Sequence, residues 1–334
     1  MEELLRVEHL SVDIGTETGT VKAVRDVSFT LGKGETVALV GESGCGKTMM
    51  TKSLLRLHDR TNARMSPESR IIFDGMDIGT LSRKELQGLR GSRIAMIFQD
   101  SMTSLNPTAP VGKQLEEALR IHTSLDKKER KDEVIRLLRM VEIPDPELRA
   151  KSYPHQLSGG MRQRVMIAMA LSCKPELLLA DEPTTALDVT IQADLLDLLK
   201  SLQKELGMSV LLVTHDLDAA VGFADRVMVM YAGRIAESGR TEDLLSHPLH
   251  PYTYALLKAM PSGHLKPKSS LYTIKGTPPD LRLPLQCCAF SSRCRYCMGA
   301  CRKALPPVTD KGGGHIVSCF LQDERAPKVE LGAL

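Results

Sequence analysis

The stretch Gly41-Glu42-Ser43-Gly44-Cys45-Gly46-Lys47-Thr48 fits the pattern G-x-x-x-x-G-K-[ST] and decides the fold. It lies between an apolar β-type run at residues 36–40 and a predicted helix over residues 47–57. Its three glycines allow successive backbone N–H groups to turn toward one anion, and the helix points its positive end at the same place. Lys47 would reach the β- and γ-phosphates of a nucleotide, and the Thr48 hydroxyl would ligate Mg²⁺. The alternative is a chance glycine-rich turn, which the flanking strand and helix argue against.

The bulk properties of the chain restrict its class. A length of 334 residues predicts one large domain with an appendage, or two domains. Since the chain has no Trp and 42% hydrophobic residues, its core must consist mainly of aliphatic side chains. The net charge of +3 gives no reason to expect a nucleic-acid partner. With neither a signal peptide nor an apolar run of ~18 residues, we expect an intracellular chain, soluble or peripheral on a membrane.

Strand-like and helical patterns surround the phosphate loop. Residues 4–12 and 21–30 predict an antiparallel sheet beside the nucleotide strand, and Val21 stands where many such domains carry an aromatic that stacks on adenine. Residues 70–73 and 93–98 predict further strands, and the second ends at Gln99, whose amide oxygen could face Mg²⁺ or an attacking water. Taken alone, Gln99 is typical of a surface residue. Periodicity at residues 112–122 and 128–141 predicts an inserted helical region.

A second helix start has a composition suited to anions. Ser158 is a good N-cap, and Gly159 and Gly160 leave backbone N–H groups bare in the first turn of a helix that continues through Leu171. The cap alone is equally compatible with an ordinary capped helix.

Acidic and imidazole side chains follow two buried strands. Asp181 and Glu182 end the apolar run 176–180, where ligands bind in open α/β sheets, so Asp181 could hold Mg²⁺ and Glu182 could polarise the attacking water. The pair could instead cap the next helix. His215 follows the buried strand 209–213 at the same sheet edge, where it could contact the γ-phosphate rather than serve a structural role. Residues 190–206 predict an amphipathic helix, and residues 226–231 and 234–237 predict a hairpin that ends the core sheet.

Several ordered motifs resemble one protein family. Gly41 to Thr48, Gln99, Leu157 to Met161, Leu179 to Glu182, Ala186-Leu187-Asp188 and His215 resemble, in this order, the ATPase subunits of ATP-binding cassette (ABC) transporters. The chain is similar to the dipeptide and oligopeptide importer group, which includes nickel importers, in three further strings. These are Met96 to Asp100 with Met102 to Pro107, Tyr153 to Met161, and His250-Pro251-Tyr252-Thr253.

The resemblance implies an α/β P-loop fold with a mixed core sheet, an antiparallel β subdomain and a helical subdomain at about residues 100–172. Residues 1–260 would form the ATPase domain. It further implies a head-to-tail dimer of ATPase subunits, often non-identical, beneath two membrane permease subunits at the cytoplasmic face of the membrane. Each ATP would lie between one chain's phosphate loop and the other chain's Ser158, Gly159 and Gly160. An extracytoplasmic binding protein would select the substrate.

The C-terminal residues 261–334 form a Pro-, Lys- and Ser-rich linker followed by clustered cysteines. Cys287, Cys288, Cys294, Cys297, Cys301 and Cys319 predict a metal or iron–sulfur site, because structural disulfides are rare in a reducing compartment. Unligated thiols are the alternative, and spacing alone does not separate zinc from iron–sulfur. The importer tail pattern resembles Cys288, Phe290, Arg293, Cys294, Cys301, His315, Val317 and Cys319, which implies a [4Fe–4S] cluster on the four cysteines. Cys287 and Cys297 lie outside this pattern, and Cys297 could displace one of the four ligands. We expect loss of this metal to unfold the tail and spare ATP binding.

The sequence therefore predicts an ATPase that powers import of short peptides. Lys47, Thr48, Gln99 and Asp181 would hold Mg-ATP, while Glu182 and His215 would position the attacking water. Nickel or metal-chelate import is an alternative, because the ATPase subunit does not touch the cargo. A soluble ABC ATPase is an alternative of another class, although such proteins often carry two cassettes or a coiled-coil insert, neither of which is seen here.

Overall fold

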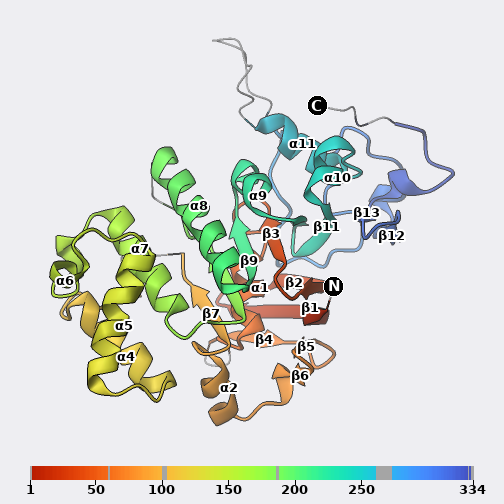
Figure 1. The fold of residues 1–334 in the computed structure, drawn as a ribbon. Coiled ribbons are helices and arrows are strands. Elements are labelled where there is room, and N and C mark those ends of the chain that lie inside the picture. Colours follow the sequence, from red (N-terminus) through yellow and green to blue (C-terminus); the bar gives the residue numbers. More distant parts are fainter. Residues whose placement is uncertain are drawn as a thin grey trace. The chain divides into compact units, whose positions relative to one another are not determined.

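The structure is a computed structural model that describes residues 2–58, 61–99, 104–185, 188–260, 273–329 and 331 (Figure 1). Of the predicted motifs, residues 100–103, Ala186 and Leu187 lie outside the described residues, as does the linker segment 261–272. The chain divides into two compact units. The helical unit contains residues 1–4, 31–36 and 77–213, and the phosphate-loop unit contains residues 5–30, 37–76 and 214–334.

Three parallel strands form the sheet of the helical unit. They are β7 (Ile94–Ile97), β8 (Leu177–Asp181) and β9 (Ser209–Thr214). Ile97 pairs with Ala180, and Asp181 pairs with Val213, so all three strands run toward the same edge. Every residue of β8 and β9 is buried, which explains why their sequences are nearly continuous apolar runs.

Helices make up most of the remainder of this unit. The predicted helices at residues 112–122 and 128–141 are confirmed within one residue as α4 (Val111–His122) and α5 (Lys127–Met140). They pack with α6 (Pro146–Arg149) and α7 (Gly159–Leu171), as Figure 1 shows. Asp126 and Glu129 start α5 with reciprocal side-chain to backbone hydrogen bonds. The unit also contains α2 (Arg83–Leu89), α8 (Val189–Leu206) and 3₁₀ turns at Ile78–Thr80 and Pro154–Gln156.

An antiparallel sheet forms one part of the phosphate-loop unit. It contains β1 (Glu3–Thr16), β2 (Gly19–Gly32), β4 (Ala63–Met65), β5 (Arg70–Phe73) and β6 (Met76–Asp77), with β1 beginning in the helical unit. The strand order is β2-β1-β5-β6, and β4 also pairs with β1. β1 and β2 extend beyond the predicted strands at residues 4–12 and 21–30, and only residues 17–18 form the turn between them.

A second sheet in this unit contains the strand that precedes the phosphate loop. β3 (Thr36–Val40) runs parallel to β10 (Arg226–Tyr231), and β11 (Arg234–Arg240) returns antiparallel through Ala232 and Gly233, which both have positive φ. The prediction that this hairpin ends the sheet was wrong. β13 (Ile316–Ser318) pairs with β11 at Glu237 and Ser238, and β12 (Val308–Asp310) pairs with β13. The added strands satisfy backbone groups that a sheet edge would leave open.

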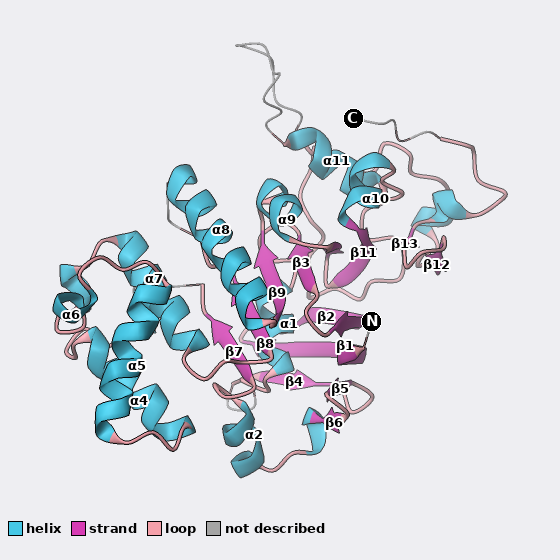
Figure 2. Cartoon of the chain, viewed as in Figure 1, coloured by secondary structure: helices cyan, strands magenta, loops and turns pink. Residues whose placement is uncertain are grey.

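The phosphate-loop unit also contains several helices. They are α1 (Lys47–Leu54), α9 (Leu217–Phe223), α10 (Thr241–Ser246) and α11 (Pro251–Ala259), with 3₁₀ turns at Ala300–Arg302 and Phe320–Gln322. Figure 2 shows α10 and α11 beside β11, and both helices contact that strand. Among the helices that the structure describes, none combines the length and the apolarity needed to cross a lipid bilayer.

Candidate functional site

The phosphate loop connects β3 to α1 in a conformation that requires glycine. Gly44 and Gly46 have φ of 78° and 110°, in the left-handed region that other residues rarely adopt. A Cβ at Gly46 would clash with the carbonyl oxygen of Ala23, and a Cβ at Gly41 would clash with that of Met230. Gly46 caps α1 without a side-chain hydrogen bond. The first turn of α1 therefore begins directly at the loop, and the N–H groups of a helix's first turn are donors that can bind an anion.

Lys47 folds back over this loop. Its Nζ donates hydrogen bonds to the carbonyl oxygens of Gly41 at 2.7 Å and Glu42 at 3.2 Å, and its side chain is buried. The ammonium is thereby held against the first two carbonyl groups of the loop, and Thr48 follows Lys47 in the first turn of α1. That this loop and Lys47 bind the phosphates of a nucleotide stays a prediction.

Gln99 and Glu182 meet at the edge of the parallel sheet in the helical unit. The Gln99 Nε2 donates to Glu182 Oε2 at 2.8 Å, and Thr185 Oγ1 donates to the same oxygen at 2.9 Å. The Gln99 amide oxygen is then the atom of this side chain that can face a metal ion. The parallel strands β7 and β8 are adjacent and end at the same edge, which brings the two residues together.

The backbone at Glu182 is unusual. Its φ is 47°, in the left-handed region, and its N–H donates to the Val213 carbonyl of β9 at 2.8 Å. Asp181, the last residue of β8, is 1% exposed. A non-glycine residue held in this conformation costs on the order of 1–3 kcal/mol, and such strain concentrates at functional sites.

The other predicted residues lie beside the ends of helices or strands. Ser158 caps α7 by accepting a hydrogen bond from the Met161 N–H at 3.2 Å, so Gly159 and Gly160 form the first turn as predicted. His215 follows β9 and is exposed, whereas its neighbour Asp216 caps α9. The structure thus joins Gln99 to Glu182 within one unit and builds the phosphate loop in the other. That all these residues act on one nucleotide stays a prediction.

Comparison with known proteins identifies the family. Residues 24–185 match the ABC transporter family, and residues 236–301 match the C-terminal region of oligopeptide/dipeptide transporters. A dipeptide transport ATP-binding protein, DppD of Bacillus subtilis, is 51% identical over 326 residues, covering 98% of this chain and 97% of the relative. The chain belongs to the ABC transporter ATPases of the oligopeptide/dipeptide group.

Two further comparisons agree with this ABC ATPase assignment. An oligopeptide transport ATP-binding protein of the same organism, OppD, is 47% identical over 98% of this chain and 91% of its own length. A solved dimeric structure of the ATP-binding cassette MJ0796, bound to ADP and Pi, superposes with a TM-score of 0.64 at 28% identity. That match covers 71% of this chain and 99% of MJ0796.

The cysteines of this ABC ATPase gather in the phosphate-loop unit. Cys288, Cys301 and Cys319 are buried, and the Cys288 N–H donates to the Cys301 carbonyl at 3.0 Å. Burial, together with repulsion from Cys288, Cys294 and Cys301, raises the pKa of Cys319 to about 12. The four cysteines of the predicted set lie close enough to influence one another, and Cys297, outside that set, acts on Cys288 and Cys294 in the same way. Among the described residues, however, no three His, Cys, Asp or Glu side chains are arranged to hold one metal ion.

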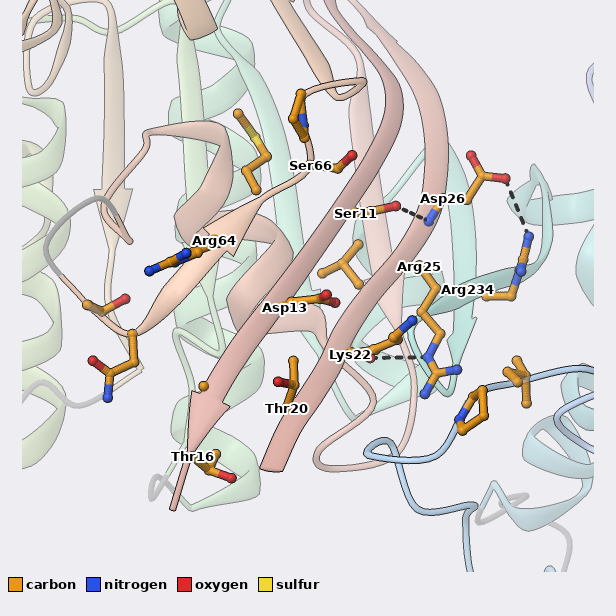
Figure 3. Close-up of a pocket in the computed structure, with 18 residues that line it drawn as sticks. Ser11, Asp13, Thr16, Thr20, Lys22, Arg25, Asp26, Arg64, Ser66 and Arg234 are labelled. Atoms are coloured by element: carbon orange, nitrogen blue, oxygen red, sulfur yellow. Dashed lines mark hydrogen bonds and ion pairs between the residues drawn. The ribbon is translucent and has the colours of Figure 1, made fainter. Parts of the chain in front are cut away.

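A large groove in this unit is separate from the phosphate loop. It has a volume of about 1170 Å³ and lies over β1, β2 and β4 (Figure 3). Asp26 pairs with Arg234 inside it, and Arg25 donates to the Lys22, Leu281 and Leu283 carbonyls. None of the residues from Gly41 to Thr48 lines this groove. Its size therefore does not identify it as the phosphate site.

Two contacts of the phosphate loop have no counterpart in the sequence prediction. The Tyr252 hydroxyl accepts a hydrogen bond from the Glu42 N–H at 3.1 Å, and Arg293 pairs with the Glu42 carboxylate. The partners are 210 and 251 residues away from Glu42, so no local pattern indicates them.

His250 makes the stability of the phosphate-loop unit sensitive to acid. Its Nδ1 accepts a hydrogen bond from the Tyr252 N–H at 3.0 Å, so protonation of that nitrogen breaks the cap of α11. Burial lowers the pKa of His250 to about 4, against the opposing influence of Glu237. The folded pKa of His250 lies below its unfolded value. The contribution of neutral His250 to the free energy of unfolding is therefore fully present above pH ~6.5, and it is lost as the pH falls toward ~4. We expect a loss of about 3 kcal/mol in unfolding free energy over that range, measured by urea unfolding.

The variant His250→Asn tests this expectation. Asn is a good N-cap that does not titrate, so its stability should depend less on pH between ~6.5 and ~4 than that of wild type. His247, which is exposed and follows α10, provides the control substitution His247→Asn. An acid dependence that is the same in His250→Asn and wild type would contradict the assignment to His250.

Proposed function

We propose that this chain is the ATP-hydrolysing subunit of an importer for dipeptides or oligopeptides. The observation that carries the proposal is the similarity to DppD over 98% of the chain, which includes both the cassette and the C-terminal region. The glycine-dependent phosphate loop and the hydrogen bond between Gln99 and Glu182 support the proposal. An extracytoplasmic binding protein would select the peptide, and partner permeases would carry it across the membrane. This chain would act at the cytoplasmic face.

The proposed mechanism assigns one role to each group. The backbone N–H groups of residues 43–48 and the Lys47 ammonium bind the ATP phosphates. The hydroxyl, amide and carboxylate oxygens of Thr48, Gln99 and Asp181 are the ligand types that Mg²⁺ prefers, and the ion neutralises phosphate charge when bound. Glu182 accepts the proton of the attacking water, and the His215 imidazole contacts the γ-phosphate.

Two chains of the ABC type would complete the site. The N–H groups at Gly159 and Gly160 would grip the γ-phosphate bound by a second ATPase subunit, which can be non-identical. ATP would then favour the closed dimer, and hydrolysis would release it, because the ligand stabilises the state that contacts it better. The isolated chain should bind nucleotide and hydrolyse it slowly.

The decisive experiment is purification of the assembled complex from membranes. Mass spectrometry should identify two multi-span permeases and a second ATPase subunit bound to the chain. In proteoliposomes, a cognate peptide with its binding protein should stimulate ATP hydrolysis. Stimulation by a nickel chelate and not by peptides would favour the metal-importer alternative. A chain that is fully active without membrane partners would favour the soluble ATPase alternative.

We also propose that Cys288, Cys294, Cys301 and Cys319 bind a [4Fe–4S] cluster. The set consists of buried or half-buried thiols, and Cys297, which is also half-buried, could replace one of the four. The proposal is supported by the resemblance of these positions to the importer tail pattern and by the chemistry of thiolates, which are the ligands of such clusters.

Anaerobic purification tests the cluster. We expect iron, acid-labile sulfide and the visible absorbance of an iron–sulfur centre, all lost in Cys288→Ser because a ligand is removed. The neighbouring substitution Cys287→Ser is the matched control and should retain them. Stoichiometric zinc without iron would refute the cluster. Chelation should unfold the tail, because metal binding and local folding are coupled.

A further inference from the structure

The C-terminal tail contacts the phosphate loop through one buried arginine. Arg293 donates from Nη1 to Glu42 Oε2 at 2.8 Å and from Nη2 to Glu42 Oε1 at 2.9 Å, a bidentate ion pair. The side-chain exposures are 4% for Arg293 and 26% for Glu42. Bidentate pairs of this kind fix orientation as well as distance.

The tail in turn fixes Arg293. Its Nε donates to the Lys275 carbonyl at 3.1 Å, and Nη1 also donates to the Tyr231 hydroxyl at 3.2 Å. The guanidinium lies over the Tyr231 and Phe290 rings, at 5.7 and 5.9 Å from their centroids. Phe290 packs against Tyr252, whose hydroxyl bonds the Glu42 N–H. The position of the guanidinium therefore depends on the folded tail between residues 274 and 294.

Glu42 is held at each of its polar groups. Its N–H donates to Tyr252, its carbonyl accepts from Lys47 and from the Cys45 N–H, and its carboxylate accepts from Arg293. The first two contacts involve the backbone of the loop itself. Anchoring the carboxylate thus restrains the peptide groups that follow Gly41.

The ion pair also neutralises a charge that opposes the ligand. A carboxylate within a loop that receives a polyphosphate repels that anion, and removing Arg293 would leave this carboxylate uncompensated. The tail covers the same loop with Pro278, Pro279 and Leu281, which enclose a hollow of about 40 Å³ against residues 42–45. The tail therefore packs directly against the phosphate loop.

We propose that Arg293 is a positioning residue for the phosphate loop, through which the folded cysteine-bearing tail sets the affinity of the chain for ATP. The proposal rests on the proposed function, because it concerns the same ATP site. It also revises the sequence-based expectation that loss of the tail's metal spares ATP binding. A tail that unfolds withdraws Arg293 and should weaken ATP binding as strongly as loss of the arginine.

The test compares Mg-ATP affinity of the full chain by titration calorimetry in a double-mutant cycle. We expect Arg293→Met to weaken binding about tenfold, the effect of one charge-assisted hydrogen bond. Glu42→Gln should weaken it less, because no unpaired carboxylate remains. The double variant should be no weaker than Arg293→Met, since both changes break one interaction. Arg293→Lys should recover part of the affinity as a single, non-bidentate donor.

Arg295→Met is the matched control, because Arg295 lies on the same segment and stacks on Tyr296. In the assembled complex, Arg293→Met should raise the KM for ATP and leave kcat unchanged, since Arg293 does not touch the reacting atoms. A folded Arg293→Met with wild-type affinity would overturn the proposal, as would additive effects in the cycle. If Arg293→Met does not fold, wild-type affinity in Glu42→Gln overturns it. Failure of wild type itself to bind Mg-ATP would instead refute the proposed function.

Discussion

Glu182→Gln should lower ATP hydrolysis by the assembled complex about 10²- to 10⁴-fold, the usual contribution of a general base, and leave ATP binding intact. Gln keeps the size of the side chain and can still accept the hydrogen bonds from Gln99 and Thr185. It cannot take the proton of the attacking water. The measurements are steady-state phosphate release and Mg-ATP titration.

Glu142→Gln provides the control for this prediction. Glu142 is an exposed carboxylate of the same unit that pairs with Arg164, so its loss should leave hydrolysis within about twofold of wild type. A Glu182→Gln complex that hydrolyses ATP at the wild-type rate would exclude Glu182 as the base. Equal loss of binding and hydrolysis would point to a structural role.

Gly46→Ala should weaken Mg-ATP binding by about 100-fold or more, because displacement of a binding group by about 1 Å is sufficient for such a loss. The new Cβ would clash with the Ala23 carbonyl, which cannot rotate away as a side chain could because it belongs to the backbone. Alanine also rarely adopts the φ of 110° found at this residue. The start of α1 and Lys47 must then move. Titration of the purified chain with Mg-ATP measures the effect.

Two other glycines separate steric clash from backbone strain. Gly44 also has positive φ, but a Cβ there meets no atom within 4 Å, so Gly44→Ala should cost about 1–2 kcal/mol in stability with a smaller loss of affinity. Gly222 lies in α9 with open space around its Cβ, and Gly222→Ala should leave affinity unchanged. Equal affinity of Gly46→Ala and Gly222→Ala would contradict the clash argument.

Patterns that repeat over short distances predicted much of the fold. The predicted bounds of β5 and β10 agree with the structure, and α4 and α5 differ by one residue. Each of these elements has its own apolar period and turn residues, so local sequence is sufficient. The sequence placed Gln99 and Glu182 at the ends of buried strands, but the hydrogen bond between them was not predicted.

Features that depend on distant residues were not predictable in this way. Glu42 and Arg293 are 251 residues apart, and neither position has a local pattern that indicates an ion pair. β13 is three residues long, too short for a period to be recognised, and it exists because β11 offers it a partner. The left-handed backbone of Glu182 is likewise imposed by surrounding contacts, because nothing about a glutamate favours that conformation.

Because β13 pairs with β11, the last part of the chain prevents the edge of β11 from pairing with another copy of the protein. It covers the backbone of Glu237 and Ser238, and His315 pairs at 2.8 Å with the fully buried Glu237 carboxylate. A chain shortened to end near Met260 would present β11 as an open strand template and leave a buried charge without its imidazole partner. Such a chain would retain every cassette motif and yet be prone to aggregate, so the tail contributes to solubility independently of any metal.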